Sequence, residues 1–128
     1  MGLLMVIDSD ILIDFARKDA KAIEFLESAL RKDVAKVSAV SHMELIVGCR
    51  NKRELSVLDR FIARFNLLDL SPAISVRATE LLRQYRSGHG LMIPDALIAA
   101  TALLEDEPLA TRNQRHFKFI EDLDLVEY

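Results

Sequence analysis

Short apolar runs alternate with amphipathic helical patterns along this chain, and this alternation constrains the fold more than any other feature. The runs have the length of buried strands and occupy residues 3–7, 34–38, 67–70, 109–111 and 123–126. Between them, apolar residues recur every three or four positions, as they do on one face of a helix. Strands that alternate with helices form a parallel sheet covered on both faces, with right-handed crossovers. We therefore expect an α/β fold with a mainly parallel sheet of four or five strands.

The expected helices begin at recognisable capping signals. Asp8 and Ser9 can cap the first helix, and Ser71 followed by Pro72 marks the start of another that ends at Gly88 and Gly90. The remaining helical patterns cover residues 20–31, a segment from 41 onward, 51–65, and a nearly all-apolar segment from 94 to 104. The last of these must be buried on several sides.

Length and composition indicate a single unit without a membrane segment. The chain has 128 residues, which is enough for one domain spanning residues 1–128 and too short to divide into two. No apolar run approaches the roughly 20 residues that cross a bilayer. The opening MGLLMVIDSD lacks the basic region of a signal peptide, and the single cysteine, Cys49, fits a reducing compartment. We therefore expect a cytoplasmic protein with no membrane partner.

Three carboxylates stand where apolar packing would be expected: Asp8 in VIDSDILID, Glu44 in SAVSHMELIVG and Asp95 in LMIPDALIAATALL. Burying a carboxylate without a partner is costly, so each needs a compensating group. In open α/β sheets, ligand sites lie beyond the carboxyl ends of the strands. Asp8 directly follows the first predicted strand, and the other two lie in helices near the ends of neighbouring strands. The three side chains can therefore converge.

Three oxygen ligands without a His or Cys cluster favour a hard ion, Mg²⁺ or Mn²⁺, over zinc. Such an ion acidifies a bound water and offsets charge that develops on a phosphoryl group, so phosphodiester hydrolysis is the predicted reaction. Asp10 is a candidate for a supporting position beside the ion, and Asp14 is expected to be solvated. The formal net charge of −3 argues against a general nucleic-acid coat protein but is compatible with a nuclease that has basic residues at its rim.

Each acid taken singly also has a purely structural explanation. Asp8 can cap a helix, Glu44 can form a capping box with Ser41, and Asp95 can complement a helix dipole. Capping does not explain why three such helix starts fall at the same edge of the sheet.

Four segments resemble, in order and spacing, the pattern of PIN-domain ribonucleases: VIDSDILIDF, SAVSHMELIVG, IPDALIAATAL and LATRNQRHF. The resemblance covers essentially the whole chain and is to the small bacterial and archaeal toxins of the VapC type. It implies a three-layer α/β/α PIN-like fold and Mg²⁺- or Mn²⁺-dependent endoribonuclease activity. It also implies a type II toxin–antitoxin pair, with RNA as substrate, a cognate antitoxin and a homodimer as partners. Asp8, Glu44 and Asp95 take the positions of the metal-binding acids.

The chain departs from the family pattern at the fourth acid. The family often has an acid in the stretch that corresponds to residues 111–117, where this chain has Asn113 and His116. Asn113 is the candidate for a catalytic hydrogen bond to water at the metal, and Thr111 can form one too. Thr111, Arg112 and Arg115 are candidates for substrate contacts, and His116 for a structural or phosphate-contacting role. Whether one or two metal ions bind stays open.

Other functional classes account for fewer of these residues. A two-component receiver domain needs an acceptor Asp after the third strand and a Lys after the fifth, but Asp69 lies inside LLDL and no Lys follows Val126. A phosphatase of the haloacid dehalogenase type needs a longer chain. A catalytically silent PIN domain that serves as a binding scaffold is the remaining alternative.

An apolar groove near the first helices is predicted to receive an antitoxin segment as a helix laid in a groove. Phe15, Phe61 and Phe65 are the candidates for its lining, although each could instead belong to the core. An Arg of the antitoxin could then pair with the metal-binding carboxylates.

Overall fold

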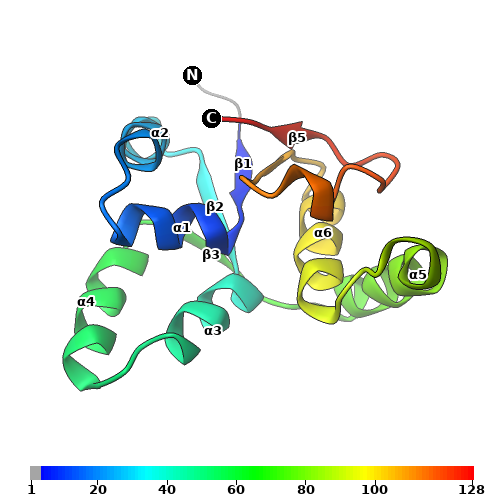
Figure 1. Ribbon diagram of the computed structural model, residues 1–128, viewed down its shortest axis with the longest axis horizontal. Helices are drawn as coiled ribbons and strands as arrows, with labels where there is room; N and C mark the ends of the chain where they lie inside the picture. Colours follow the sequence, from blue (N-terminus) through cyan, green and yellow to red (C-terminus); the bar gives the residue numbers. More distant parts are fainter. Residues whose placement is uncertain (1–3) are drawn as a thin grey trace.

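The computed structural model describes residues 4–128 and places one parallel sheet between two layers of helices (Figure 1). Over these residues the strands are β1 (Met5–Ile7), β2 (Ala35–Ser38), β3 (Asn66–Leu68), β4 (Leu109–Ala110) and β5 (Leu125–Val126). The helices are α1 (Ser9–Ala16), α2 (Ala20–Arg31), α3 (Ala39–Val47), α4 (Lys52–Ile62), α5 (Pro72–His89), α6 (Ile93–Glu105) and the short 3₁₀ helix η1 (Gln114–His116). The strand order is β3-β2-β1-β4-β5 with every pair parallel, so the predicted three-layer fold is confirmed.

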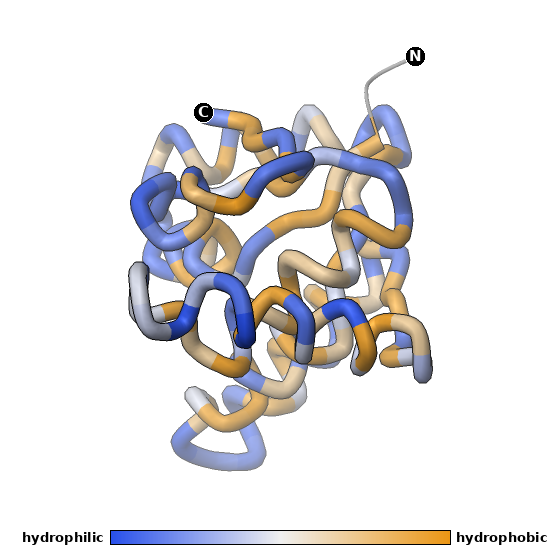
Figure 2. The backbone as a smooth tube through the Cα atoms, turned by 90° about the vertical axis from the view of Figure 1, so that its right-hand side faces the viewer, coloured by the Kyte–Doolittle hydropathy of each residue, from blue (hydrophilic) through white to orange (hydrophobic). Residues whose placement is uncertain are grey.

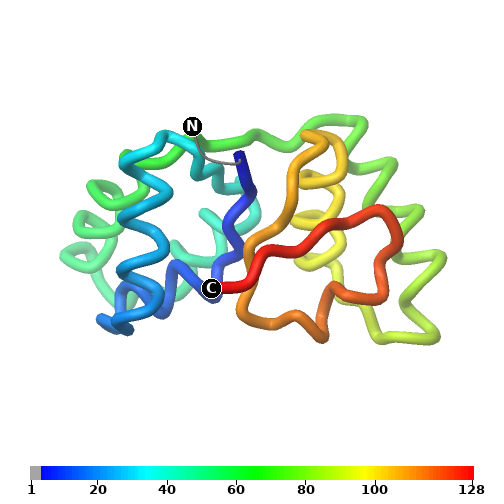
Figure 3. The backbone as a smooth tube through the Cα atoms, turned by 90° about the horizontal axis from the view of Figure 1, so that it is seen from above, coloured from blue at the N-terminus to red at the C-terminus, as the bar shows by residue number. Residues whose placement is uncertain are grey.

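Each face of the sheet packs against its own set of helices. Val6 belongs to an apolar cluster with residues of α5 and α6, whereas its neighbour Ile7 belongs to a cluster with residues of α1 and α2. This division follows from the strand geometry, because successive side chains point to opposite faces. Viewed from above, β1 lies between α1 to α4 on one side and α5 and α6 on the other (Figure 3). Hydrophobic stretches run through the middle of the molecule, and many of the hydrophilic ones lie at its peripheral bends (Figure 2).

The apolar character of α6 has the predicted cause. Six of its residues are buried: Ala96, Ile98, Ala99, Ala100, Thr101 and Ala102. The preceding helix, α5, ends at Gly90, whose φ of 70° is a left-handed conformation that glycine adopts without steric cost. That sharp ending leaves only two residues, Leu91 and Met92, between Gly90 and the start of α6. Asp95 is thereby placed in the first turn of α6.

Several predicted boundaries differ from those observed. The helix expected over 51–65 ends at Ile62, because Arg64 and Phe65 donate to carbonyls only three residues back and tighten the last turn. The strand expected over 67–70 lies one to two residues earlier, and the last strand is confined to Leu125–Val126. Leu3, with which the first predicted strand begins, lies outside the described residues. Within residues 4–128, no helix is both long enough and apolar enough to span a bilayer.

Candidate active site

The candidate site forms at the carboxyl end of β1, near which α1, α3 and α6 begin (Figure 1). The backbone N–H of Asp8 donates to the carbonyl of Ala110 at 2.9 Å, which continues the pairing of β1 with β4. This pairing places the residue after β1 beside the residue after β4, Thr111. The helices attached to these strands lie on opposite faces of the sheet, as at the ligand sites of open α/β folds.

Asp8 is buried, with 5% of its surface exposed, and both carboxylate oxygens accept hydrogen bonds. Oδ1 accepts from the backbone N–H of Ser9 at 2.8 Å, so Asp8 caps α1 as predicted. Oδ2 accepts from the hydroxyl of Thr111 at 2.8 Å. Thr111 is itself 1% exposed, so its hydroxyl orients the acid from inside the protein rather than from a solvated rim.

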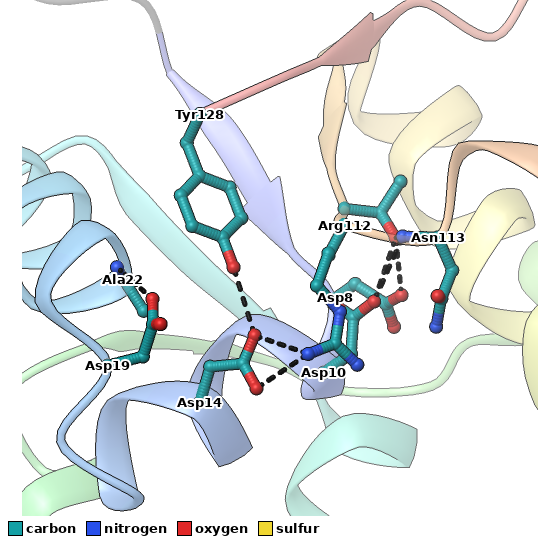
Figure 4. A network of polar contacts seen from close by, with 9 residues as sticks. Asp8, Asp10, Asp14, Asp19, Ala22, Arg112, Asn113 and Tyr128 are labelled. Carbon is teal, nitrogen blue, oxygen red and sulfur yellow. Dashed lines mark hydrogen bonds and ion pairs between the residues drawn. The ribbon is translucent and has the colours of Figure 1, made fainter.

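Asp10 lies beside Asp8 at this site (Figure 4). Its Oδ2 accepts from the backbone N–H of Asn113 at 3.1 Å and from the hydroxyl of Thr111 at 3.4 Å. Its Oδ1 is buried without a hydrogen-bond partner. The sequence carried a signal for this position: Asp10 is a second acid, in the first turn of a largely apolar helix that Asp8 already caps.

Glu44 approaches from α3 through a contact with the first helix. Its Oε1 accepts from the hydroxyl of Ser9 at 3.2 Å. The predicted capping box of Ser41 and Glu44 was wrong, because α3 begins earlier and Ser38 caps it by accepting from the N–H of Ser41 at 3.1 Å. Glu44 therefore makes no capping contact that would account for it. The contact between Ser9 and Glu44 was not predicted.

Asp95 approaches from the first turn of α6, where the helix dipole favours a negative charge. The Nδ1 of His116 lies 3.7 Å from its Oδ2, so His116 contacts an acid of the site rather than standing apart from it.

The acids of this site affect one another electrostatically. Burial, and then the charge of Asp10, raises the pKa of Asp8 to about 7, and Asp95 adds to the effect. Burial also raises the pKa of Asp95 and of Glu44; the charge of Asp10 contributes at Asp95, and the charge of Asp95 contributes at Glu44. The charges of Asp10 and Asp95 therefore oppose the ionisation of neighbouring acids.

The residues of the site fit a hard divalent cation in their chemistry. All four acids offer oxygen ligands, the pKa values of Asp8, Glu44 and Asp95 are raised, and one buried oxygen of Asp10 has no hydrogen-bond partner. Across residues 4–128, however, no group of three or more His, Cys, Asp or Glu side chains is arranged so that it could hold a metal ion.

Arg112 and Asp14 form an ion pair next to the acidic site (Figure 4). The Nη1 of Arg112 lies 2.7 and 2.6 Å from the two oxygens of Asp14, and the hydroxyl of Tyr128 donates to the same carboxylate at 3.0 Å. The prediction that Asp14 is solvated was wrong, since only 7% of its surface is exposed. Arg115, in contrast, is exposed on η1.

Comparisons with known proteins agree with this fold. Residues 5–122 match the family model described as PIN domain. Among curated relatives, Ribonuclease VapC10 of Mycobacterium tuberculosis is 37% identical over 121 residues, covering 94% of this chain and 90% of that protein. Ribonuclease VapC19 of the same species is 33% identical over 123 residues, covering 94% and 97%.

A solved structure agrees over the same length. VapBC2 from Rickettsia felis, bound to a DNA fragment from its promoter, superposes with a TM-score of 0.82 and 26% identity, covering 98% of this chain and 99% of that chain. The chain therefore belongs to the PIN-domain family, and its relatives within that family are of the VapC type.

Proposed function

We propose that this chain is a metal-dependent endoribonuclease that hydrolyses RNA phosphodiester bonds and acts as the toxin of a type II toxin–antitoxin pair. The observation that supports the proposal is the arrangement at the carboxyl end of β1, where Ser9 follows Asp8 and donates to Glu44, and where burial raises the pKa of Asp8, Glu44 and Asp95. The relatives named Ribonuclease VapC support the reaction, and the VapBC complexes support the pairing with an antitoxin.

In this proposal Asp8, Glu44 and Asp95 hold Mg²⁺ or Mn²⁺. When bound, such an ion acidifies a water molecule and neutralises charge that develops on the scissile phosphate. Ser9 and Thr111 donate hydrogen bonds that fix the carboxylates of Glu44 and Asp8. The side-chain amide of Asn113 is the proposed hydrogen-bonding partner of the attacking water, since its backbone is already held beside the acids.

Substrate contacts are proposed for the residues that follow β4. Arg115 is exposed and carries no ion pair among those of the described residues, so its guanidinium is free to bind a phosphate. Arg112 is a weaker candidate, because Asp14 already takes two of its hydrogen bonds. Thr111 is buried and directed at the acids, so a direct contact with RNA would have to accompany a shift of the loop.

The direct test is incubation of the purified protein with mixed RNA in Mg²⁺ or Mn²⁺, with a chelator control. Asp95→Asn is expected to abolish cleavage, whereas Asp124→Asn, a substitution at an exposed position outside the site, is expected to retain it. If the unmodified protein shows no metal-dependent cleavage, the catalytically silent scaffold is favoured instead.

The antitoxin is proposed to bind a groove of about 1210 Å³ between α1, α3 and α4. Its apolar lining includes Ile13, Phe15, Leu45, Val57, Leu58 and Phe61. Phe15 and Phe61 both line this groove and stack with ring centroids 4.8 Å apart. The third predicted residue, Phe65, is 8% exposed and belongs to the core, so its assignment to the groove was wrong. Glu44 also lines the groove, which therefore leads to the acidic site.

A homodimer in the cytoplasm is proposed as the free form of the protein. Exposed apolar side chains on α3 and at the start of α6 offer a contact surface: Met43, Val47, Met92 and Ile93. Light scattering after size-exclusion chromatography would detect the dimer, and Val47→Asp would be expected to dissociate it.

A further inference from the structure

The first helix carries two buried acids whose hydrogen-bond partners differ: Asp14 has a cationic partner and Asp10 has none. Asp10 and Asp14 are one turn apart on α1 and are 8% and 7% exposed. Asp14 has a complete set of partners, since Arg112 contacts both of its oxygens and the hydroxyl of Tyr128 adds a third hydrogen bond. Asp10 accepts on Oδ2 only, from Thr111 and the backbone N–H of Asn113, and neither donor carries a charge.

A buried carboxylate oxygen without a partner requires an explanation, because an unpaired buried acceptor costs free energy. Oδ1 of Asp10 is such an atom. Asp10 and Asp8 both accept from the hydroxyl of Thr111, at 3.4 and 2.8 Å, so Asp10 lies within the acidic site rather than behind it. A divalent cation would satisfy the unpaired oxygen and neutralise the neighbouring carboxylates at the same time.

We propose that Asp10 is the fourth acid of the metal site and replaces the acid that the VapC-type pattern often places near Asn113 and His116. This inference rests on the proposed function. In this arrangement, Asn113 contributes its backbone N–H to orient Asp10 rather than a side-chain charge. The fourth carboxylate therefore comes from the first motif of the chain instead of the last.

Metal affinity tests this assignment without reference to RNA cleavage. Mn²⁺ binding would be measured by electron paramagnetic resonance and by titration calorimetry on unmodified protein, Asp8→Asn, Asp10→Asn and Asp14→Asn. Asp14→Asn is the matched control, because it removes a carboxylate of equal burial from the same helix but outside the acidic site. Asp10→Asn retains an acceptor oxygen for Asn113, and Asp10→Ser serves as a second variant if it does not fold by circular dichroism.

Asp10→Asn is expected to weaken Mn²⁺ binding about tenfold or more, while Asp14→Asn changes it by less than about twofold. The melting temperature of the metal-free Asp10→Asn variant at pH 8 is expected to rise, because the repulsion at Asp8 and Asp95 is relieved. If Asp10→Asn bound Mn²⁺ as tightly as the unmodified protein and had a lower melting temperature, the assignment would be overturned. Asp10 would then only hold the loop after β4 through the backbone N–H of Asn113. In that case the proposed function would still stand if Asp8→Asn abolished Mn²⁺ binding. If the unmodified protein bound no Mn²⁺, both the proposed function and the assignment of Asp10 would fail.

Discussion

At the scale of single residues, Asp8 combines two roles that conflict energetically. It caps α1, which stabilises the helix, but it does so while buried beside Asp10. Its pKa therefore rises from an ordinary 3.8 to about 7. The ionised carboxylate of Asp8 therefore destabilises the folded chain, and a bound cation could offset this destabilisation.

This cost predicts a dependence of stability on pH in the absence of metal. Because the pKa of Asp8 is higher in the folded than in the unfolded chain, the folded chain binds the proton more tightly. The resulting stabilisation is complete below pH 3.8 and is lost as the pH rises through about 7, with an upper bound of roughly 4 kcal/mol. Thermal denaturation in a chelator should therefore give a lower melting temperature at pH 8 than at pH 5.

Asp8→Asn is the matched variant for this measurement, since an asparagine can still cap the helix. Its melting temperature should change less between the two pH values and should exceed that of the unmodified protein at pH 8. An equally steep pH dependence in the variant would contradict the role assigned to Asp8.

Thr111 is predicted to contribute through its hydroxyl alone. Thr111→Val keeps the shape of the side chain but removes the one hydroxyl donor that Asp8 and Asp10 share, which should cost about 1 to 3 kcal/mol. Denaturant unfolding would measure this loss at neutral pH. Thr111→Ser restores the hydroxyl and should recover most of the stability; a serine variant as unstable as the valine variant would point to packing instead.

At the scale of elements, the segment from β4 to η1 is tied to α1 by neighbouring contacts. Thr111 and Asn113 bond to acids in the first turn, and Arg112 bonds to Asp14 one turn later. These contacts hold the loop after β4 against α1, although the two segments are about a hundred residues apart in the chain.

The two arginines of this segment are predicted to behave differently. Arg112→Ala should lower the melting temperature, by the equivalent of about 1 to 3 kcal/mol, because it leaves the buried carboxylate of Asp14 without its cation. Arg115→Ala should leave the melting temperature unchanged but raise KM for RNA, because its side chain is exposed. Steady-state cleavage assays beside thermal denaturation would separate the two effects, and a large loss of stability in Arg115→Ala would exclude a substrate role.

At the scale of the whole molecule, the groove and the acidic site are on the same side of the fold and share Glu44. The antitoxin helix proposed for this groove would therefore reach Glu44, with which a cationic side chain could pair. The rim of the groove adds Arg17, Lys18, Arg50 and Arg53, which favours an acidic partner segment.

A charge placed in this groove should block the partner without affecting folding. Val57 lies in the groove with 54% of its surface exposed, and Val76 is similarly exposed, at 60%, on α5 in the opposite layer. Val57→Asp should weaken binding of a cognate antitoxin peptide about tenfold or more, whereas Val76→Asp should not. Calorimetric titration measures both, and equal effects of the two variants would place the partner elsewhere.

The fold class and the order of the elements could be predicted from the sequence alone, whereas the joint metal site of Asp8, Glu44 and Asp95 stays a prediction. A repeat of 3.6 residues is a local property, so Leu26 and Leu81 could be recognised as buried helical residues from their neighbours alone. The position of Asp8 after an apolar run was likewise enough to place it at the edge of the sheet, because parallel strands present their carboxyl ends together.

Only the tertiary structure decided how the other polar residues are used. Asp14 was predicted to be solvated, but it is buried against Arg112, which is 98 residues away in the chain. Phe65 and Phe61 are equally apolar, and a tightened turn at the end of α4 buries the first while the second lines the groove. Contacts between segments that are distant in the chain decide whether such a side chain is buried or exposed, and the sequence pattern of a single helix does not contain these contacts.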